Sequence, residues 1–163
     1  MDFTTDRLSA EPLSLDHLGD LTALHLDPEV SRYLGGVRSP AETDQYLKAN
    51  LAHWAAHGFG IWIVRTLDGR FAGRAGIRHT EVEGTPEVEI AYTLHRSLWG
   101  QGLATEVAQA LVRMWQAHRL SPSLVGIASL DNAPSRRVLE KVGFAYEREA
   151  IYHDTPVVIY RMR

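Results

Sequence analysis

Apolar and polar residues follow two different periods along the chain, and the change of period divides it into helices and strands. In the first third, apolar residues recur every three or four positions and predict two helices. The first is capped by Ser14 or Asp16, and the second begins at the capping box Ser39-Pro40-Ala41-Glu42 and ends at Gly58. Residues 7–13 alternate weakly and predict a short edge strand before these helices.

From Gly60 onward the period shortens to two, which is typical of strands. The sequence Leu67-Asp68-Gly69-Arg70 predicts a hairpin turn, and we expect an acidic turn over 81–86 before the next strand. Two further helices then alternate with strands. The predicted strands cover 61–64, 71–78, 88–94, 124–130, 145–152 and 157–162, and the predicted helices cover 102–118 and 131–143.

This order of elements predicts a mixed α/β (α+β) fold, in which an antiparallel meander meets a crossover helix. We expect a mostly antiparallel sheet of about seven strands, flanked by about four helices. The sequence contains no internal repeat, low-complexity tract or linker-like stretch, and one domain over residues 1–163 is the simplest organisation.

Composition and charge narrow the function classes. The 163 residues carry a formal net charge of −3 with the two signs interspersed, which argues against a nucleic-acid partner. There is no cysteine to serve as a nucleophile or metal ligand. No run approaches the roughly 18 apolar residues of a membrane span, and the N-terminus lacks the pattern of a signal peptide. We therefore expect a cytoplasmic protein with no membrane partner.

The most informative stretch is the loop 99–105, which joins a predicted strand to a predicted helix. The first turn of a helix offers free backbone N–H groups and the positive end of its dipole, which suits a pyrophosphate. A side chain at Gly100 or Gly102 would hold the backbone away from the phosphates. On the glycines alone, however, an ordinary turn is the more common explanation. The dinucleotide fingerprint fits poorly at Thr105, and the Gly-Lys-Ser/Thr of a P-loop is absent.

Two separated stretches resemble the signatures of one family. The run Glu89-Ile-Ala-Tyr-Thr-Leu94, followed by Trp99-Gly-Gln-Gly-Leu-Ala-Thr-Glu106, resembles motif A of the GNAT acetyltransferases. It is most similar to the RimJ/RimL-like branch, which acetylates the N-termini of ribosomal proteins. Downstream, Asn132-Ala-Pro-Ser135 and Glu140-Lys-Val-Gly-Phe144 resemble the second signature of that branch. The similarity covers nearly the whole chain and implies the GNAT fold, with acetyl-CoA as the co-substrate.

The resemblance also implies a set of cofactor-binding residues. In the family, a strand backbone pairs with the pantetheine arm, a loop holds the pyrophosphate, and two polar residues lie near the pantetheine and the thioester sulfur. Carried onto this sequence, these are Tyr92, Thr93 and Leu94 for the strand, Trp99, Gly100, Gln101, Gly102, Leu103, Ala104 and Thr105 for the loop, and Asn132 and Ser135 for the polar residues. Arg136, Arg137 and Lys141 are candidates for the ribose phosphate.

Direct attack of an amine on a thioester requires a base for the amine and an acid for the departing thiolate. Strand alternation places Glu89 on a polar face that suits a cleft wall, provided that no bulge interrupts the strand. The resemblance assigns the same carboxylate as the base. Many GNAT enzymes use a tyrosine as the acid where this chain has Leu139, and we expect Ser135, or a water that it orders, as the replacement. Tyr146 and Tyr152 are weaker alternatives.

The acceptor implied by the family is an amine, either a peptide N-terminus or a small molecule. Residues expected around it are Tyr33, Leu34, Trp62, Arg78, Tyr152 and His153. The acidic residues Glu81, Glu83, Glu87 and Glu89 would favour a cationic amine in that region. A homodimer is compatible with the family.

Other interpretations stay open. His53 and His57 are four residues apart on a predicted helix, but without an evident third ligand we expect no metal. The same fold could use another short acyl-CoA. A non-catalytic acyl-CoA-binding or sensor domain would keep the loop but not the chemistry.

Overall fold

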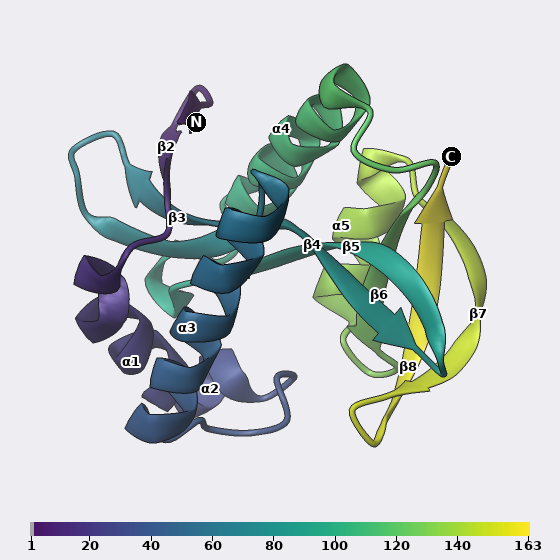
Figure 1. Cartoon of the computed structure of the whole chain (residues 1–163), viewed down its shortest axis with the longest axis horizontal. Helices are drawn as coiled ribbons and strands as arrows, with labels where there is room; N and C mark the ends of the chain where they lie inside the picture. The colour runs from purple at the N-terminus through teal and green to yellow at the C-terminus, as the bar shows by residue number, and fades with distance from the viewer. Residues whose placement is uncertain (1) are drawn as a thin grey trace.

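One mixed sheet organises the part of the chain that the computed structural model describes, residues 2–163. Within those residues, eight strands lie in the order β1-β2-β3-β4-β5-β6-β8-β7, and every neighbouring pair is antiparallel except β5 and β6 (Figure 1). The strands are β1 (Phe3–Thr4), β2 (Leu8–Pro12), β3 (Ile61–Thr66), β4 (Phe71–Val82), β5 (Thr85–Leu94), β6 (Leu124–Ser129), β7 (Ala145–Tyr152) and β8 (Thr155–Met162). The predicted mixed α/β layout is confirmed, with one strand more than expected.

The extra strand and one misplaced turn are the main differences from prediction. Strand β1 contains two residues, too few to show an alternating pattern, and it pairs with β2. The acidic turn expected over 81–86 is wrong, because β4 and β5 continue through most of it. The actual turn is Glu83-Gly84, where both residues have positive φ, as a tight hairpin requires. Val82 is buried, and this keeps the preceding residues in the sheet.

Three of the four predicted helices begin and end near their predicted capping residues. The first begins later than predicted, at Leu18, after a 3₁₀ turn over Leu15–His17, and a short helix over Pro28–Ser31 was not predicted. Residues 2–163 thus contain five α-helices. They are α1 (Leu18–Leu26), α2 (Pro28–Ser31), α3 (Pro40–His57), α4 (Leu103–His118) and α5 (Ala133–Val142). At the start of α3, the Ser39 hydroxyl accepts the Glu42 amide at 3.1 Å, and the Glu42 carboxylate accepts the Ser39 amide at 3.0 Å. Gly58 ends the helix in the left-handed conformation.

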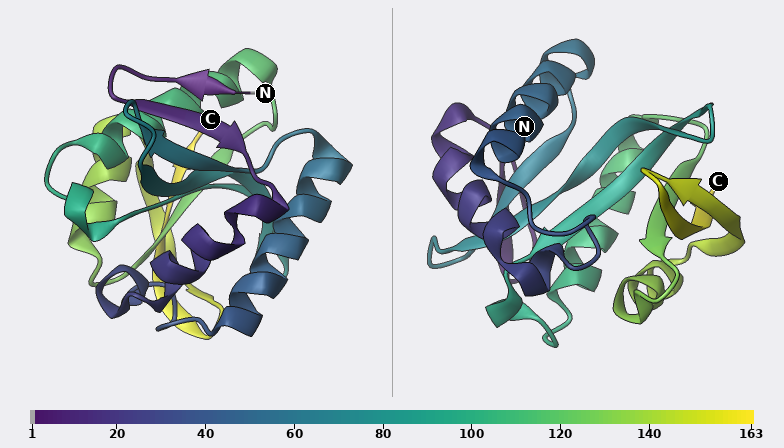
Figure 2. Two further views of the ribbon diagram at one scale, coloured as in Figure 1. Left: turned by 90° about the vertical axis from the view of Figure 1, so that its left-hand side faces the viewer. Right: turned by 90° about the horizontal axis from the view of Figure 1, so that it is seen from below.

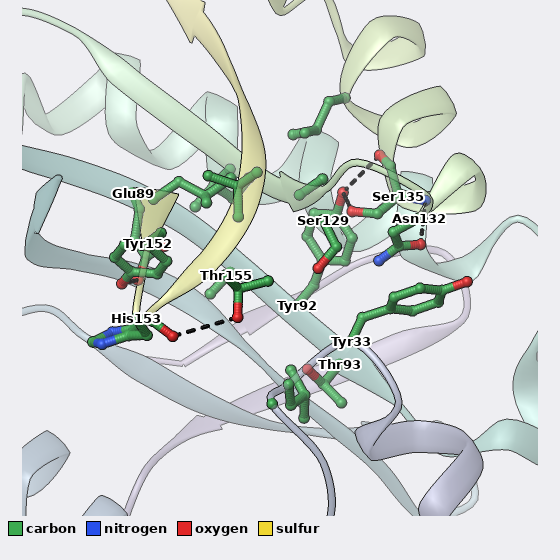
Figure 3. A pocket seen from close by; sticks show the side chains of 18 of the residues that line it. Tyr33, Glu89, Tyr92, Thr93, Ser129, Asn132, Ser135, Tyr152, His153 and Thr155 are labelled. Atoms are coloured by element: carbon green, nitrogen blue, oxygen red, sulfur yellow. Dashed lines mark hydrogen bonds between the residues drawn. The ribbon is translucent and has the colours of Figure 1, made fainter. Parts of the chain in front are cut away.

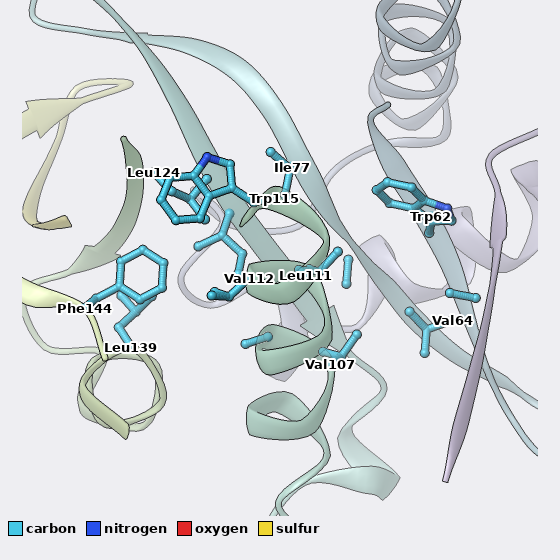
Figure 4. Close-up of a cluster of buried hydrophobic side chains, with 14 of the residues drawn as sticks. Trp62, Val64, Ile77, Val107, Leu111, Val112, Trp115, Leu124, Leu139 and Phe144 are labelled. Atoms are coloured by element: carbon cyan, nitrogen blue, oxygen red, sulfur yellow. The ribbon is translucent and has the colours of Figure 1, made fainter. Parts of the chain in front are cut away.

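The helices cover both faces of the sheet. Helices α1 and α3 pack over its N-terminal half on one face, while α4 and α5 lie on the other (Figures 1 and 2). The main core lies between the sheet and α4, where Val107, Leu111 and Trp115 are buried (Figure 4). No helix between residues 2 and 163 is both long and apolar enough to cross a membrane.

The sheet divides between β5 and β6. These strands run parallel and pair at only two positions, Glu89 with Val125 and Ile90 with Gly126. Past that point, no strand of the described residues pairs with β5 on its β6 side. Helix α5 packs closely on β6, because a Cβ at Gly126 would lie 2.3 Å from Leu139. The short parallel contact therefore leaves the C-terminal part of β5 with an unpaired edge inside the sheet.

Candidate active site

A cavity of ≈ 220 Å³ opens where β5 and β6 diverge. Its walls come from β4, β5, β6, the first turn of α5, the segment after α2 and the β7–β8 turn. Glu89, Tyr152 and His153 lie towards one end of this cavity, and Tyr92, Asn132 and Ser135 lie towards the other (Figure 3). Segments far apart in the sequence thus bring their polar side chains into one space.

Glu89 is the only carboxylate among the described residues that line this cavity. Its side chain is buried, and Oε1 accepts hydrogen bonds from Arg78 Nε at 2.7 Å and from the Tyr152 hydroxyl at 3.4 Å. No described residue donates to Oε2. Burial opposes the charge on Arg78, but the Glu89 carboxylate outweighs it and raises the pKa of the guanidinium above its ordinary value. One carboxylate oxygen is thus fixed while the other is left for a ligand.

The β4–β5 ladder runs without a register shift from Gly73–Leu94 to Val82–Thr85. The alternation used to place Glu89 is therefore intact.

A second polar pair lies at the other end of the cavity. The Tyr92 hydroxyl donates to the Ser135 carbonyl at 3.2 Å and lies 3.1 Å from the Ser135 hydroxyl. Burial raises the pKa of Tyr92 to about 12, and the hydrogen bond to Ser135 only partly opposes this. The phenol therefore keeps its proton at neutral pH. Sequence reasoning used only the backbone of Tyr92 and missed this side chain.

The predicted pyrophosphate loop has the backbone shape that its glycines allow. Gly100 and Gly102 have φ values of 74° and 76°, which a residue with a side chain adopts only under strain. Gly102 directly precedes α4 and aligns the loop with the N-terminus of that helix. Arg7 braces the loop, because its Nη1 donates to the Gln101 carbonyl at 2.8 Å and its Nε pairs with Glu106. Nothing in the local sequence pointed to Arg7.

These features have counterparts in known proteins. A family model described as an acetyltransferase (GNAT) domain matches residues 7–145. The chain belongs to the GNAT acetyltransferases. It is therefore an acetyl-CoA-dependent N-acetyltransferase, which transfers an acyl group to an amine.

Individual relatives agree with this assignment. The uncharacterized protein YkkB of Bacillus subtilis (strain 168) is 28% identical over 138 residues, which cover 84% of this chain and 80% of that protein. The solved acetyltransferase from Agrobacterium tumefaciens str. C58 is 26% identical with a TM-score of 0.88, covering 100% of this chain and 94% of its own. RimL, a ribosomal L7/L12 alpha-N-protein acetyltransferase solved with coenzyme A, shares the fold at 21% identity, with a TM-score of 0.80 and coverage of 97% and 94%.

The residues predicted to bind the GNAT co-substrate fall into two groups. Tyr92, Thr93, Asn132 and Ser135 line the cavity together with Glu89, whereas Leu94 and the loop 99–105 do not. The side chains of Leu94 and Leu103 are buried in the core. The half-exposed Trp99 ties the start of the loop to the end of β5, because its indole N–H donates to the Leu94 carbonyl at 3.0 Å.

The second-signature residues also have structural duties. Asn132 caps α5 by accepting the Ser135 amide at 3.3 Å through Oδ1, which leaves its side-chain N–H donors for a ligand. Arg136 donates to the Leu130 carbonyl at 2.9 Å and to the Tyr160 hydroxyl at 3.2 Å. It therefore anchors α5 to the sheet, whereas Arg137 and Lys141 are exposed.

Five of the six predicted acceptor-site residues line the cavity: Tyr33, Leu34, Arg78, Tyr152 and His153. The prediction for Trp62 is wrong. Its side chain is fully buried and packs at right angles to Trp54 and Phe3 as part of the core. Alternation along a strand does not tell which face carries a cleft and which carries a helix.

The expectation of an acidic acceptor region is also wrong. Glu87 pairs with Arg161 at 2.7 Å, and Glu83 pairs with Arg148 at 3.3 Å, both away from the cavity. Glu81 lies outside the cavity lining as well. Three arginines, Arg38, Arg74 and Arg78, line it instead.

The expectation that His53 and His57 lack a third partner is contradicted. His79, at the far end of β4, brings one ring nitrogen within 4.8 Å of one from each. However, His53 already uses both ring nitrogens: Nδ1 donates to the Phe59 carbonyl at 2.9 Å, and Nε2 accepts the His79 amide at 3.0 Å. A metal that used His53 Nε2 would have to displace the His79 amide from it. The expectation that no metal binds stays a prediction.

Proposed function

We propose that this enzyme acetylates a primary amine that enters the cavity beside Glu89, by direct transfer from acetyl-CoA without a covalent enzyme intermediate. The observation that carries the proposal is the buried Glu89 carboxylate, held by Arg78 through Oε1 while no residue of 2–163 donates to Oε2. A base must lie within hydrogen-bond reach of the proton that it removes, and this oxygen is the one available in the cavity.

The residues of the chain fit the shape of the co-substrate. The left-handed glycines Gly100 and Gly102 give close access to the backbone at the N-terminus of α4, which suits a pyrophosphate. The unpaired edge of β5 at Tyr92 and Thr93 suits an extended pantetheine arm, and the Asn132 amide lies beside it in the cavity wall. When bound, acetyl-CoA supplies an acetyl thioester as the activated acyl group.

Glu89 would accept the proton that the amine must lose before or during attack. Arg78 keeps the carboxylate in place, and Tyr152 supports the same oxygen. The Thr80 hydroxyl lies 2.7 Å from the Tyr152 hydroxyl and completes this chain of hydrogen bonds. The carboxylate is therefore oriented before the amine arrives, which reduces the reorganisation needed in the transition state.

Tyr92 would stabilise the departing thiolate, whereas Leu139 stands where many family members have the tyrosine acid. Its pKa of about 12 lies above the roughly 8.5 of a free thiol, so complete proton transfer from the phenol is unfavourable. The hydroxyl would instead turn its one proton from the Ser135 carbonyl to the leaving sulfur and stabilise the developing charge there. Ser135 orients this hydroxyl from a distance of 3.1 Å. The proton itself then comes from solvent.

The test is a thiol-release assay with acetyl-CoA and a panel of primary amines, with mass spectrometry of each amine. We expect thiol release that depends on the amine and a product heavier by one acetyl group. Tight CoA binding without turnover on any amine would instead support the non-catalytic sensor. Faster turnover with another short acyl-CoA would identify that compound as the acyl donor, and the proposed role of Glu89 would be unaffected.

A further inference from the structure

Three guanidinium groups converge at the Glu89 end of the cavity. Arg38, Arg74 and Arg78 all line it, and all three lie over the ring of Tyr46, at 5.2, 4.7 and 5.9 Å from its centre. Arg74 and Arg78 share one face of β4, whereas Arg38 comes from the segment before α3. Like charges converge in this way only where something offsets their repulsion.

The protein offsets only part of this charge, through the Tyr46 ring, through Glu89 and, for Arg38, through the more distant Glu42. Arg74 is 3% exposed, and its Nε donates a hydrogen bond to Nε2 of the fully buried His25 at 3.0 Å. His25 is neutral, because burial lowers its pKa to about 3 and the charges of Arg74 and Arg38 act in the same direction. Across residues 2–163, no carboxylate lies within ion-pair distance of Arg74 or Arg38. Glu89, the one carboxylate in the cavity, is paired with Arg78.

Hydrogen-bond donors therefore outnumber acceptors here. The Arg38 side chain has no hydrogen-bond partner among residues 2–163. Arg38 lies over the ring of Tyr46, whose hydroxyl is the one buried side-chain polar atom of residues 2–163 without a hydrogen-bond partner. Arg74 is buried and Arg38 is half-buried, and buried charges are normally paired because desolvating an unpaired one is costly. A bound anion with several acceptor oxygens would supply what this cluster lacks, and a carboxylate matches the planar fork of arginine.

The position of the cluster tells which reactant carries the anion. The phosphates of the co-substrate belong at the loop 99–105, and that loop does not line this cavity. Arg78 bonds directly to Glu89, so the cluster adjoins the proposed base. An anion held by the arginines and an amine held at Glu89 would thus lie a few atoms apart. This spacing suits one small molecule that carries both groups.

We infer that the acceptor is an aminocarboxylate, such as a free α-amino acid, whose carboxylate binds Arg38 and Arg74 while its amine faces Glu89. The inference rests on the proposed N-acetyltransferase chemistry and specifies its substrate class. Arg38 and Arg74 are then specificity-determining residues. The cavity discriminates against amines without an anionic group, because these leave the guanidinium groups unpaired.

The experiment compares free amino acids with the matching amino amides, which differ only in the carboxylate. In the thiol-release assay we expect the acid to have a kcat/KM at least 10-fold higher than its amide. The acid should prevail even though the amide has the less basic amine and more of its neutral form at pH 7. The Arg38→Gln variant should raise the KM of the acid by about 10- to 100-fold, the range for a charged hydrogen bond, and leave the amide unchanged.

Arg113→Gln, on the exposed side of α4, is the charge-matched control and should leave both acceptors unchanged. Arg38→Lys keeps the charge but not the fork and should fall between wild type and Arg38→Gln. Binding of an N-acetyl amino acid and of its amide to the CoA complex, measured by calorimetry, gives a readout without turnover. Equal rates or equal binding for acid and amide would overturn the inference while leaving the acetyltransferase standing. If no amine is acetylated but the N-acetyl amino acid still binds more tightly than its amide, only the catalytic proposal is overturned.

Discussion

The loop 99–105 and the Glu89 end of the cavity solve two binding problems in opposite ways. The loop offers backbone: two left-handed glycines and the start of α4 shape it, and Arg7 braces it from outside. The cavity offers side chains from several elements, including a buried carboxylate and three arginines. A backbone site tolerates variation in its neighbours, whereas a side-chain site changes with a single substitution. This is the arrangement expected of a family with a constant donor and a variable acceptor.

The largest expected effect comes from removing the Glu89 carboxylate, which should affect catalysis but not the binding of CoA at the loop 99–105. Glu89→Gln should lower kcat by roughly 10²–10⁴, because general-base catalysis is lost. The amide can still accept a hydrogen bond from Arg78, and CoA affinity should stay within about twofold. Steady-state kinetics and calorimetry measure the two quantities. If turnover matches wild type from pH 6 to 9, Glu89 is not the base.

A substitution in the loop 99–105 should have the converse effect and weaken the binding of CoA. Gly102→Glu forces a side chain into a left-handed position and sets a negative charge against the phosphates. We expect the Kd for CoA to rise by about 100-fold or more, by calorimetry. Gly69→Glu, at a hairpin glycine with φ of 89° remote from the loop, controls for backbone strain alone. If the Gly102 variant binds CoA with wild-type affinity, the loop does not hold the pyrophosphate.

A third substitution tests the middle of the cavity, where the two regions meet. Tyr92→Phe should lower kcat by about 10²-fold, because the leaving sulfur loses a hydrogen-bond donor. Ser135→Ala should lower it by about 10-fold, because Tyr92 keeps its bond to the backbone carbonyl of residue 135 but loses the contact with the Ser135 hydroxyl. If Ser135→Ala is the more damaging of the two, Ser135 rather than Tyr92 is the direct donor. Single-turnover kinetics would distinguish them.

The smallest predicted effect is on stability and concerns His25, which accepts the hydrogen bond from Arg74. His25 takes up a proton in the unfolded chain near pH 6.5 but in the native protein only near pH 3, so acid favours unfolding. Its contribution is complete above pH 6.5 and declines as the pH falls. Between pH 7 and 5, His25 alone should lower the unfolding free energy by about 2 kcal/mol.

Urea denaturation at pH 7 and at pH 5 measures this difference. The His25→Gln variant can still accept a hydrogen bond from Arg74 but does not titrate, so it should show a correspondingly smaller loss. His53 and His79, whose pKa values burial also lowers, contribute in both proteins and cancel in the comparison. An equal loss in both proteins would contradict the account of His25.

The same contrast explains how much could be predicted from sequence. The helices, the crossover and the loop 99–105 follow from local signals: caps, periods and glycines. The arginine cluster does not, because Arg74 sits inside an apolar strand pattern and its partner His25 is 49 residues away. Likewise, the Tyr92 hydroxyl meets Ser135 across 43 residues. Pairing of side chains over such separations depends on the packed sheet and leaves no local pattern.

The two-position contact between β5 and β6 also bears on the free protein. Past Ile90, β5 keeps an open edge inside the sheet, and such edges can recruit a strand from another chain. Here the edge lines the cavity that β6, the first turn of α5 and the β7–β8 turn also enclose. These neighbouring elements would limit the space for a strand from another chain. Backbone amides at this edge should exchange with solvent rapidly until a ligand is bound.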